Sequence, residues 1–190
     1  MSNYFSKFAK VQYLGKSAVN ISRRVKVLEQ LYSTPTAYLS YTIKEGERPE
    51  DIAYYYYEDI TKVWLVFLAN NIVDPYSQWP LDQSNFESYI IAKYQAQSGT
   101  TGYNVLNWTR NTGITANVVH YENIEDPTIK ISKDTFTLNS SLGLIQSAEW
   151  QPVRYYDYEL ELNENKRNIF LVNRTYAKQM QKELEKLVNA

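Results

Sequence analysis

Hydrophobic and polar positions alternate most regularly in the middle of the chain. Leu39, Tyr41 and Ile43 are separated by polar residues, which predicts a half-buried strand over residues 38–43. Less regular patterns precede and follow this stretch. The chain is therefore predicted to have three zones, an N-terminal arm (1–37), a central domain (38–97) and a C-terminal region (98–190).

Three helices are predicted after this strand. The first begins at Pro49, because the fixed φ and missing N–H of proline suit the first helical position. The second, residues 58–69, is apolar almost all round and must be buried on several sides, and the third begins at the capping-box pattern Ser84–Glu87. Residues 74–80 between them are too proline-rich for a helix or a central strand. The side chains expected to face inward are Ile52, Ala53, Tyr56, Phe86, Tyr89, Ile90 and Tyr94.

The two flanking zones show shorter patterns. Residues 11–21 predict extended chain with a turn at Gly15, followed by a short helix capped by Ser22. The C-terminal region is predicted to be β-rich, with a final helix from about Thr175. Its strands are expected at residues 105–108, 114–119, 129–138, 153–162 and 169–172, and the apolar stripe of its helix at Ala177, Met180, Leu184 and Leu187. The expected fold class is α+β.

Composition narrows the possible functions. The 190 residues include no cysteine and one histidine, which excludes disulfides, thiolate metal sites and sites with two imidazoles. The net charge of −1 argues against polybasic binding to nucleic acid or to a membrane surface. The longest apolar run, Val63–Ala69, is shorter than the roughly 18 residues of a membrane span, and the N-terminus has no signal-peptide pattern. We expect a soluble cytoplasmic product that has no cofactor or metal and binds neither nucleic acid nor membrane.

The charged residues give no arrangement that resembles an active site. Asp157, Glu159 and Glu161 form an acidic row that could bind a divalent cation, but the solvated face of a half-buried strand is the favoured interpretation. Four acidic residues near a turn could form a carboxylate pair, but they fit better as charges at a helix N-terminus; they are Glu45, Glu47, Glu50 and Asp51. His120 is interpreted as structural. We therefore predict that the protein is not an enzyme.

Tyrosine is the unusual component, with 18 residues. A tyrosine ring buries a large area while its hydroxyl keeps a hydrogen bond, so an excess suits either a core or a partly wet interface. Four of them are consecutive, Tyr54 to Tyr57. On a helix these positions point in four directions, so one or two are expected to be exposed or to meet a partner, unless helices pack on both sides.

Residues 41–71 resemble a LysM module. The matching features are Tyr41–Glu47, then Ile52-Ala53, then a helix that ends at Asn70-Asn71. The resemblance implies a βααβ fold that binds N-acetylglucosamine polymers such as peptidoglycan, at loops corresponding to residues 45–51 and 70–76. The sequence departs from the family after residue 71, where the usual turn and second strand are replaced.

A second resemblance covers nearly the whole chain. Residues 41–53, 64–76 and 79–81 resemble the small baseplate wedge protein of contractile-tailed (T4-like) phages, the gene product 53 family. Residues 2–5 and 158–169 fit the same family, and residues 98–150 match least. The resemblance implies a structural protein with a LysM-like domain in the virion tail, assembled in the host cytoplasm. It implies partners among the other wedge proteins and the central hub protein, and a role in joining wedges to one another.

Eight residues are predicted to bind partners or to pack in the LysM-like zone. They are Arg48, Tyr54, Tyr55, Tyr56, Tyr57, Asp74, Tyr76 and Trp79. The N-terminal arm and the C-terminal helix are expected to extend onto neighbouring subunits. The alternative is a peptidoglycan-binding module, and a third hypothesis is a glycosidase that uses Glu45 or Glu50.

Overall fold

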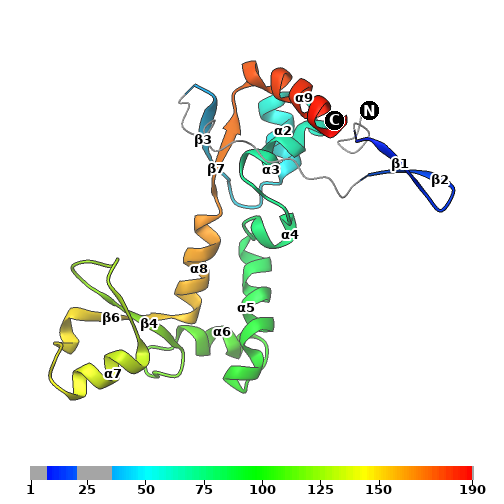
Figure 1. Cartoon of the computed structure of the whole chain (residues 1–190). Coiled ribbons are helices and arrows are strands. Elements are labelled where there is room, and N and C mark those ends of the chain that lie inside the picture. The colour runs from blue at the N-terminus through cyan, green and yellow to red at the C-terminus, as the bar shows by residue number, and fades with distance from the viewer. Residues whose placement is uncertain (1–7, 21–35, 190) are drawn as a thin grey trace. The chain divides into compact units, whose positions relative to one another are not determined.

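The structure, a computed structural model, describes residues 8–20 and 36–189. The helix predicted from Ser22 lies outside these residues. The described chain forms two compact units, one from residues up to 80 together with those from 166 onward, and one from residues 81–165 (Figure 1). Both units contain helices and strands, which confirms the α+β class.

The first unit is built around a two-stranded antiparallel sheet. Strand β3 (Tyr38–Thr42) pairs with β7 (Asn168–Val172), so that Tyr38 lies opposite Val172 and Thr42 opposite Asn168. Helices α2 (Pro49–Tyr57), α3 (Val63–Ala69), α4 (Pro75–Gln78) and α9 (Arg174–Asn189), the 3-10 helix η2 (Ile60–Lys62) and the hairpin of β1 (Lys10–Tyr13) with β2 (Lys16–Val19) complete it. The predicted strands at 38–43 and 169–172 and the final helix are confirmed.

Helix α2 begins where proline predicted it. Pro49 is its first residue, and the Asp51 carboxylate accepts a hydrogen bond from the Arg48 backbone N–H at 3.1 Å. The bond gives the backbone N–H at the helix start an acceptor. The negative charge of Asp51 in the first turn also interacts favourably with the helix dipole. The helix ends at Glu58, which adopts the left-handed φ of 57°.

The core of the first unit forms where α2, α3 and α9 pack against the sheet. No residue of α3 is exposed, which confirms that its nearly uniform hydrophobicity reflects burial on several sides. In α2 the buried tyrosine is Tyr57, while Tyr56 is half-buried. The buried cluster consists of Tyr38, Ile43, Ile52, Ala53, Tyr57, Leu65, Val66, Ala69, Ile169, Leu171, Val172 and Ala177.

Residues 74–80, predicted to be neither helix nor central strand, contain the short helix α4. Pro75 is its first residue, where the missing N–H removes no helical hydrogen bond. The Asp74 carboxylate caps it by accepting from the Tyr76 N–H at 3.1 Å and from the Ser77 hydroxyl at 2.6 Å. The prediction failed because proline excludes a helix interior but favours a helix start.

The second unit combines four α-helices and one 3-10 helix with a three-stranded antiparallel sheet. The elements are α5 (Gln83–Ser98), α6 (Tyr103–Arg110), β4 (Val118–Asn123), β5 (Lys130–Ser132), α7 (Lys133–Ser141), η3 (Ser147–Glu149), β6 (Trp150–Arg154) and α8 (Tyr155–Asn165). The sheet has the order β5-β4-β6. The core lies between α5, α6 and α8 and contains Phe86, Ile90, Tyr94, Val105, Leu106 and Tyr156.

Three helices stand where the sequence predicted strands, so the C-terminal region is not β-rich. Helix α6 replaces the strand at 105–108, α7 covers most of the strand at 129–138, and α8 covers most of that at 153–162. In α8 the buried residues are Tyr156, Glu159 and Asn163, at helical spacing. Two of the three are polar, so the helical period is invisible in a pattern of hydrophobic residues. The predicted third helix is confirmed, but its cap is Asp82 and not Ser84.

The chain enters and leaves the second unit at one place. The side chain of Asn163 accepts a hydrogen bond from the Leu81 N–H at 2.8 Å and donates one to the Leu81 carbonyl at 2.9 Å. The second unit is thus an insertion between α4 and β7. The compact units therefore differ from the predicted zones, because β7 and α9 return to the first unit and α5 belongs to the second.

Candidate docking surfaces

The four consecutive tyrosines divide between core and surface. Tyr54 and Tyr55 are 61% and 73% exposed, and their rings meet edge to face at 5.6 Å. Tyr57 is buried, and its hydroxyl donates to the Val172 carbonyl at 3.0 Å. Burial raises the pKa of Tyr57 above its ordinary value. The expectation that one or two would be exposed is confirmed, and Tyr57 acts inside the fold.

Tyr56 lies between these extremes at the end of α2. The Arg174 guanidinium stands 5.1 Å from the centre of its ring, and burial raises the pKa of its hydroxyl. Arg174 also donates to the Tyr55 carbonyl at 3.4 Å and contacts Glu58 at 3.3 Å. The start of α9 therefore fixes the end of α2, so that Tyr54 and Tyr55 project from a supported helix.

The loop before α2 is organised by one carboxylate. Glu47 accepts hydrogen bonds from the Tyr41 hydroxyl at 2.7 Å and from the Lys44 N–H at 2.9 Å. Burial, together with the bond to Glu47, raises the pKa of Tyr41 to about 12. Glu45 pairs with Arg167. These partners, with the capping role of Asp51, favour the structural interpretation of the acidic cluster over a catalytic pair.

The remaining predicted contact residues differ in exposure. Tyr76 is 93% exposed on α4, and Arg48 and Asp74 are exposed at helix starts. Trp79 is half-buried and donates its indole N–H to the Glu47 carbonyl at 2.9 Å. Tyr76 is therefore free to meet another molecule, whereas Trp79 holds two loops of its own unit together.

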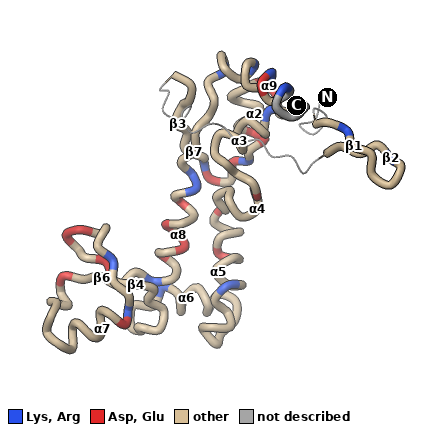
Figure 2. The backbone as a smooth tube through the Cα atoms, in the orientation of Figure 1, with Lys and Arg blue, Asp and Glu red and all other residues tan. Residues whose placement is uncertain are grey.

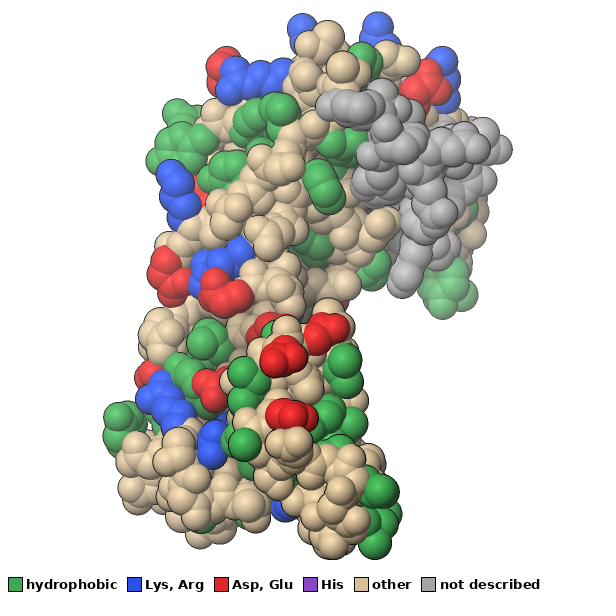
Figure 3. Space-filling model, turned by 90° about the vertical axis from the view of Figure 1, so that its left-hand side faces the viewer, with side chains coloured by type: hydrophobic (Ala, Val, Ile, Leu, Met, Phe, Trp, Pro, Cys, Tyr) green, Lys and Arg blue, Asp and Glu red, His purple; other side chains and the backbone are tan. Residues whose placement is uncertain are grey.

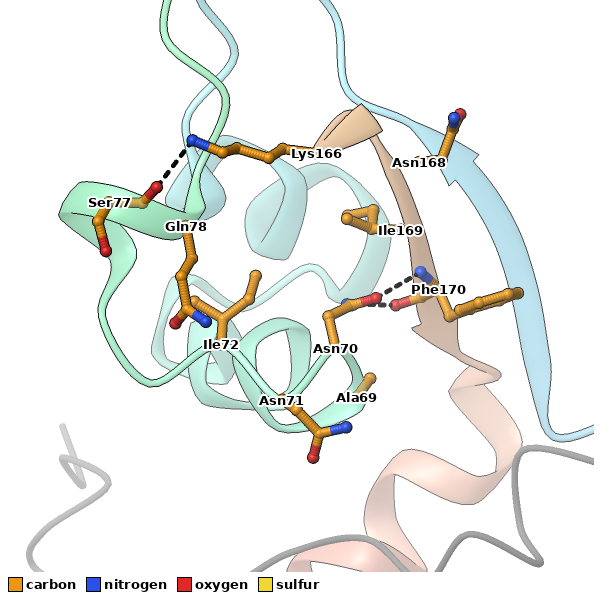
Figure 4. A pocket seen from close by; sticks show the side chains of 10 residues that line it. All are labelled: Ala69, Asn70, Asn71, Ile72, Ser77, Gln78, Lys166, Asn168, Ile169 and Phe170. Carbon is orange, nitrogen blue, oxygen red and sulfur yellow. Dashed lines mark hydrogen bonds between the residues drawn. The ribbon is translucent and has the colours of Figure 1, made fainter. Parts of the chain in front are cut away.

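A pocket of about 670 Å³ lies beside β7, at the end of α3 (Figure 4). Asn70 bonds to the backbone of Phe170 there, donating to its carbonyl at 2.9 Å and accepting from its N–H at 2.7 Å. Lys166 donates to the Ser77 carbonyl at 2.8 Å, and Gln78 accepts from the N–H groups of residues 73 and 74. These polar side chains are engaged within the chain, so the pocket offers no observation in favour of glycan binding.

The hairpin of β1 and β2 is exposed at every position. Its turn places Leu14 at φ 49° and Gly15 at φ 73°, the pattern of a two-residue hairpin turn, and Leu14 is 85% exposed. A two-stranded hairpin without a packed face is marginally stable in water. The sequence predicted the turn at Gly15 but not the pairing.

The acidic row predicted as a solvated strand face lies on α8, and Glu159 is buried. It accepts hydrogen bonds from Lys93 at 2.7 Å, Tyr94 at 2.7 Å and Tyr89 at 3.1 Å. Burial opposes ionisation, but these donors hold the pKa of Glu159 below its usual range. The result is a charged link between α5 and α8, which sequence reasoning missed because its donors lie 65 to 70 positions away.

His120 is also structural, as predicted. Its Nε2 lies 3.0 Å from a Glu122 carboxylate oxygen, and Lys130 donates to the same oxygen at 2.7 Å. Hydrogen bonds from Lys130 and His120 hold the pKa of Glu122 below its ordinary value. The group thus ties β4 to β5.

The second unit also has an uncharged surface that sequence reasoning missed. Residues 135–148 contain no charged side chain, and Leu138, Leu142 and Leu144 are 58–69% exposed. Depletion of charge around exposed apolar groups is typical of interface cores. Hydrophobic side chains are visible on the surface of both units in Figure 3, and Figure 2 shows acidic and basic residues interspersed along the backbone.

The described residues thus present surfaces for contact with other molecules. Within residues 8–20 and 36–189 there is no group of three or more His, Cys, Asp or Glu side chains that could hold a metal ion. Among the helices described there, none has the length and apolarity to cross a membrane.

Comparison with known proteins identifies the assembly. A family model described as base plate wedge protein 53 matches residues 3–187, and the chain belongs to this phage family. It is accordingly a structural protein of the virion tail base plate, and it associates with other base plate proteins. A search of curated proteins finds no match to the chain.

Proposed function

We propose that the protein is a docking subunit that binds the core of the base plate wedge and links wedges to one another and to the central hub. The family match over residues 3–187 carries this proposal. The exposed tyrosines of α2 support it, because aromatic side chains that project from a fixed helix lose little entropy on binding. The neighbours in the tail are other wedge proteins and the hub protein.

The first unit is proposed to be a LysM-like domain adapted to bind protein. Its elements β3, α2, α3 and β7 follow the order strand, helix, helix, strand, and the two strands pair antiparallel. The second strand, absent from the sequence after residue 71, is supplied by residues 168–172 after the inserted unit. Arg48, Tyr54, Tyr55, Tyr56, Asp74 and Tyr76 remain the proposed contact residues of this domain, and Tyr57 and Trp79 support them from within.

Co-expression with the other base plate wedge proteins tests the proposal. The wild-type chain is expected to co-purify with them as one complex. The double substitution Tyr54→Ala with Tyr55→Ala is expected to reduce recovery by at least about tenfold, since removing each interface aromatic costs about 1–2 kcal/mol and about 1.4 kcal/mol corresponds to a factor of ten. Tyr103→Ala is the matched control, because Tyr103 is 64% exposed in the second unit. A chain that stays monomeric in the presence of the wedge proteins contradicts the docking role.

A further inference from the structure

The hydrogen-bond alternation of the β3–β7 pair determines which backbone groups face outward. The Ile43 N–H donates to the Arg167 carbonyl at 2.9 Å, and the Asn173 N–H donates to the Ala37 carbonyl at 2.8 Å. In an antiparallel pair, bonded and non-bonded positions alternate. The odd-numbered residues of both strands therefore bond across the pair, and the N–H and C=O groups of the even-numbered residues face the two outer edges.

The middle of the outer edge of β7 is closed by side chains of the same unit. The amide of Asn70 takes both outward groups of Phe170, as a residue of a neighbouring strand would. The Tyr57 hydroxyl bonds to the outward carbonyl of Val172. Figure 4 shows the two bonds between Asn70 and Phe170. These bonds occupy the backbone groups with which another strand would pair at the middle of this edge.

Strand β3 lacks such cover at Ser40 and Thr42. Within the described residues, no hydrogen bond involves the outward N–H and C=O groups of Ser40 and Thr42, and both residues are exposed. Proteins commonly protect an edge strand with proline or lysine. The edge strands of the second unit follow this rule, with Pro152 in β6 and Lys130 in β5. Strand β3 reads Tyr-Leu-Ser-Tyr-Thr and carries neither.

We propose that β3 is completed by an extended segment of a neighbouring base plate protein, which adds a third strand to the β3–β7 sheet. This inference rests on the proposed function and names the backbone groups through which that docking occurs. An edge of alternating N–H and C=O groups at the spacing of a strand is matched by another polypeptide backbone, and not by a glycan or a lipid. Strand addition of this kind gains its affinity from main-chain bonds.

The flanking side chains limit the chemistry of the added strand. Ser40 and Thr42 are small and leave room for a close backbone approach. Leu39 is 48% exposed, although its cross-strand partner Leu171 is buried. Because cross-strand neighbours on one face contact each other, the residue placed beside Leu39 is expected to be apolar. None of the five side chains of β3 is charged, so the incoming segment is also expected to be uncharged where it faces them.

Residue-resolved hydrogen exchange on the isolated protein and on the wedge complex tests the proposal. The amides of Ser40 and Thr42 are expected to exchange rapidly in the isolated protein and to become protected in the complex. The amide of Tyr41, which bonds within the β3–β7 pair, is expected to be protected in both and reports that the strand is folded. If the chain co-purifies with the wedge while Ser40 and Thr42 exchange as fast as before, strand addition is overturned and the docking role survives. If the chain does not co-purify, the proposed function itself fails.

A pair of substitutions gives an independent measurement. Ser40→Pro removes an outward N–H that makes no bond within the described chain, whereas Ser40→Ala removes the hydroxyl and keeps the N–H. Ser40→Pro is expected to lower incorporation into the wedge on the order of tenfold, and Ser40→Ala to leave it unchanged. Circular dichroism checks that both variants fold. If Ser40→Pro does not fold, the hydrogen-exchange measurement on the unsubstituted protein tests the proposal by itself. The isolated protein could instead form concentration-dependent dimers in which the amides of Ser40 and Thr42 are protected. That result would show that a second copy of the chain occupies the β3 edge, and it would overturn the proposal.

Discussion

Asn70 is the residue whose removal tests most directly how the first unit is closed. Its side chain bonds to the Val66 carbonyl at 2.7 Å and to both outward backbone groups of Phe170. Asn70→Ala deletes three hydrogen bonds and leaves the backbone of Phe170 unpaired. Each such bond is worth about 0.5–1.5 kcal/mol net. Phe170 is 48% exposed, so water replaces part of the loss. The expected destabilisation is about 1–3 kcal/mol.

Urea unfolding measures this change, and hydrogen exchange localises it. The midpoint is expected to fall with an unchanged m-value, because the surface exposed on unfolding stays the same. The Phe170 amide is expected to exchange faster, while the β3 amides that bond to β7 stay protected. Gln95→Ala, at an exposed position of α5, serves as the control. An unfolding free energy within about 0.5 kcal/mol of wild type, the usual range for surface substitutions, refutes the assigned role of Asn70.

Three further predictions concern side chains engaged within the units. Tyr57→Phe is expected to cost about 1–2 kcal/mol in urea unfolding, because the buried Val172 carbonyl loses its donor. Trp79→Phe is expected to cost about 0.5–1.5 kcal/mol, measured in the same way, through loss of the bond to the Glu47 carbonyl. The folded-state pKa of Glu159 is lowered, so its stabilisation is present above the unfolded pKa of about 4.3 and is lost as pH falls through the folded pKa. Glu159→Gln is expected to flatten this acid dependence of thermal unfolding, and an unaltered pH profile contradicts the assignment.

Local sequence signals predicted the elements whose burial is hydrophobic. The alternation in residues 38–43, Pro49 at a helix start and the apolar stripe from Ala177 to Leu184 each correspond to an observed element. In these segments the residues that face the core are also the hydrophobic ones. Periodicity then reports the side of the element that is buried.

The failures occur where polar residues are buried or where contacts span a long stretch of sequence. Helix α8 buries Glu159 and Asn163, so its alternating apolar residues imitated a strand. The pairing of β3 with β7 joins Thr42 to Asn168, 126 positions apart, and no local pattern encodes it. For the same reason the internal roles of Tyr57 and Trp79 required the structure, because their partners Val172 and Glu47 lie far away in the sequence.

The insertion explains how the first unit tolerates such a distant strand. Two hydrogen bonds between Asn163 and the backbone of Leu81 hold the entry and exit of the second unit together. The entropy lost on closing a flexible loop grows only slowly with the length of the loop. Because the inserted residues fold around a core of their own, most of them do not behave as a flexible loop between β3 and β7. Strand β7 starts three residues after α8 ends. The side chains of Asn70 and Tyr57, which bond to the far edge of β7, come from the segment that precedes the insertion in the chain.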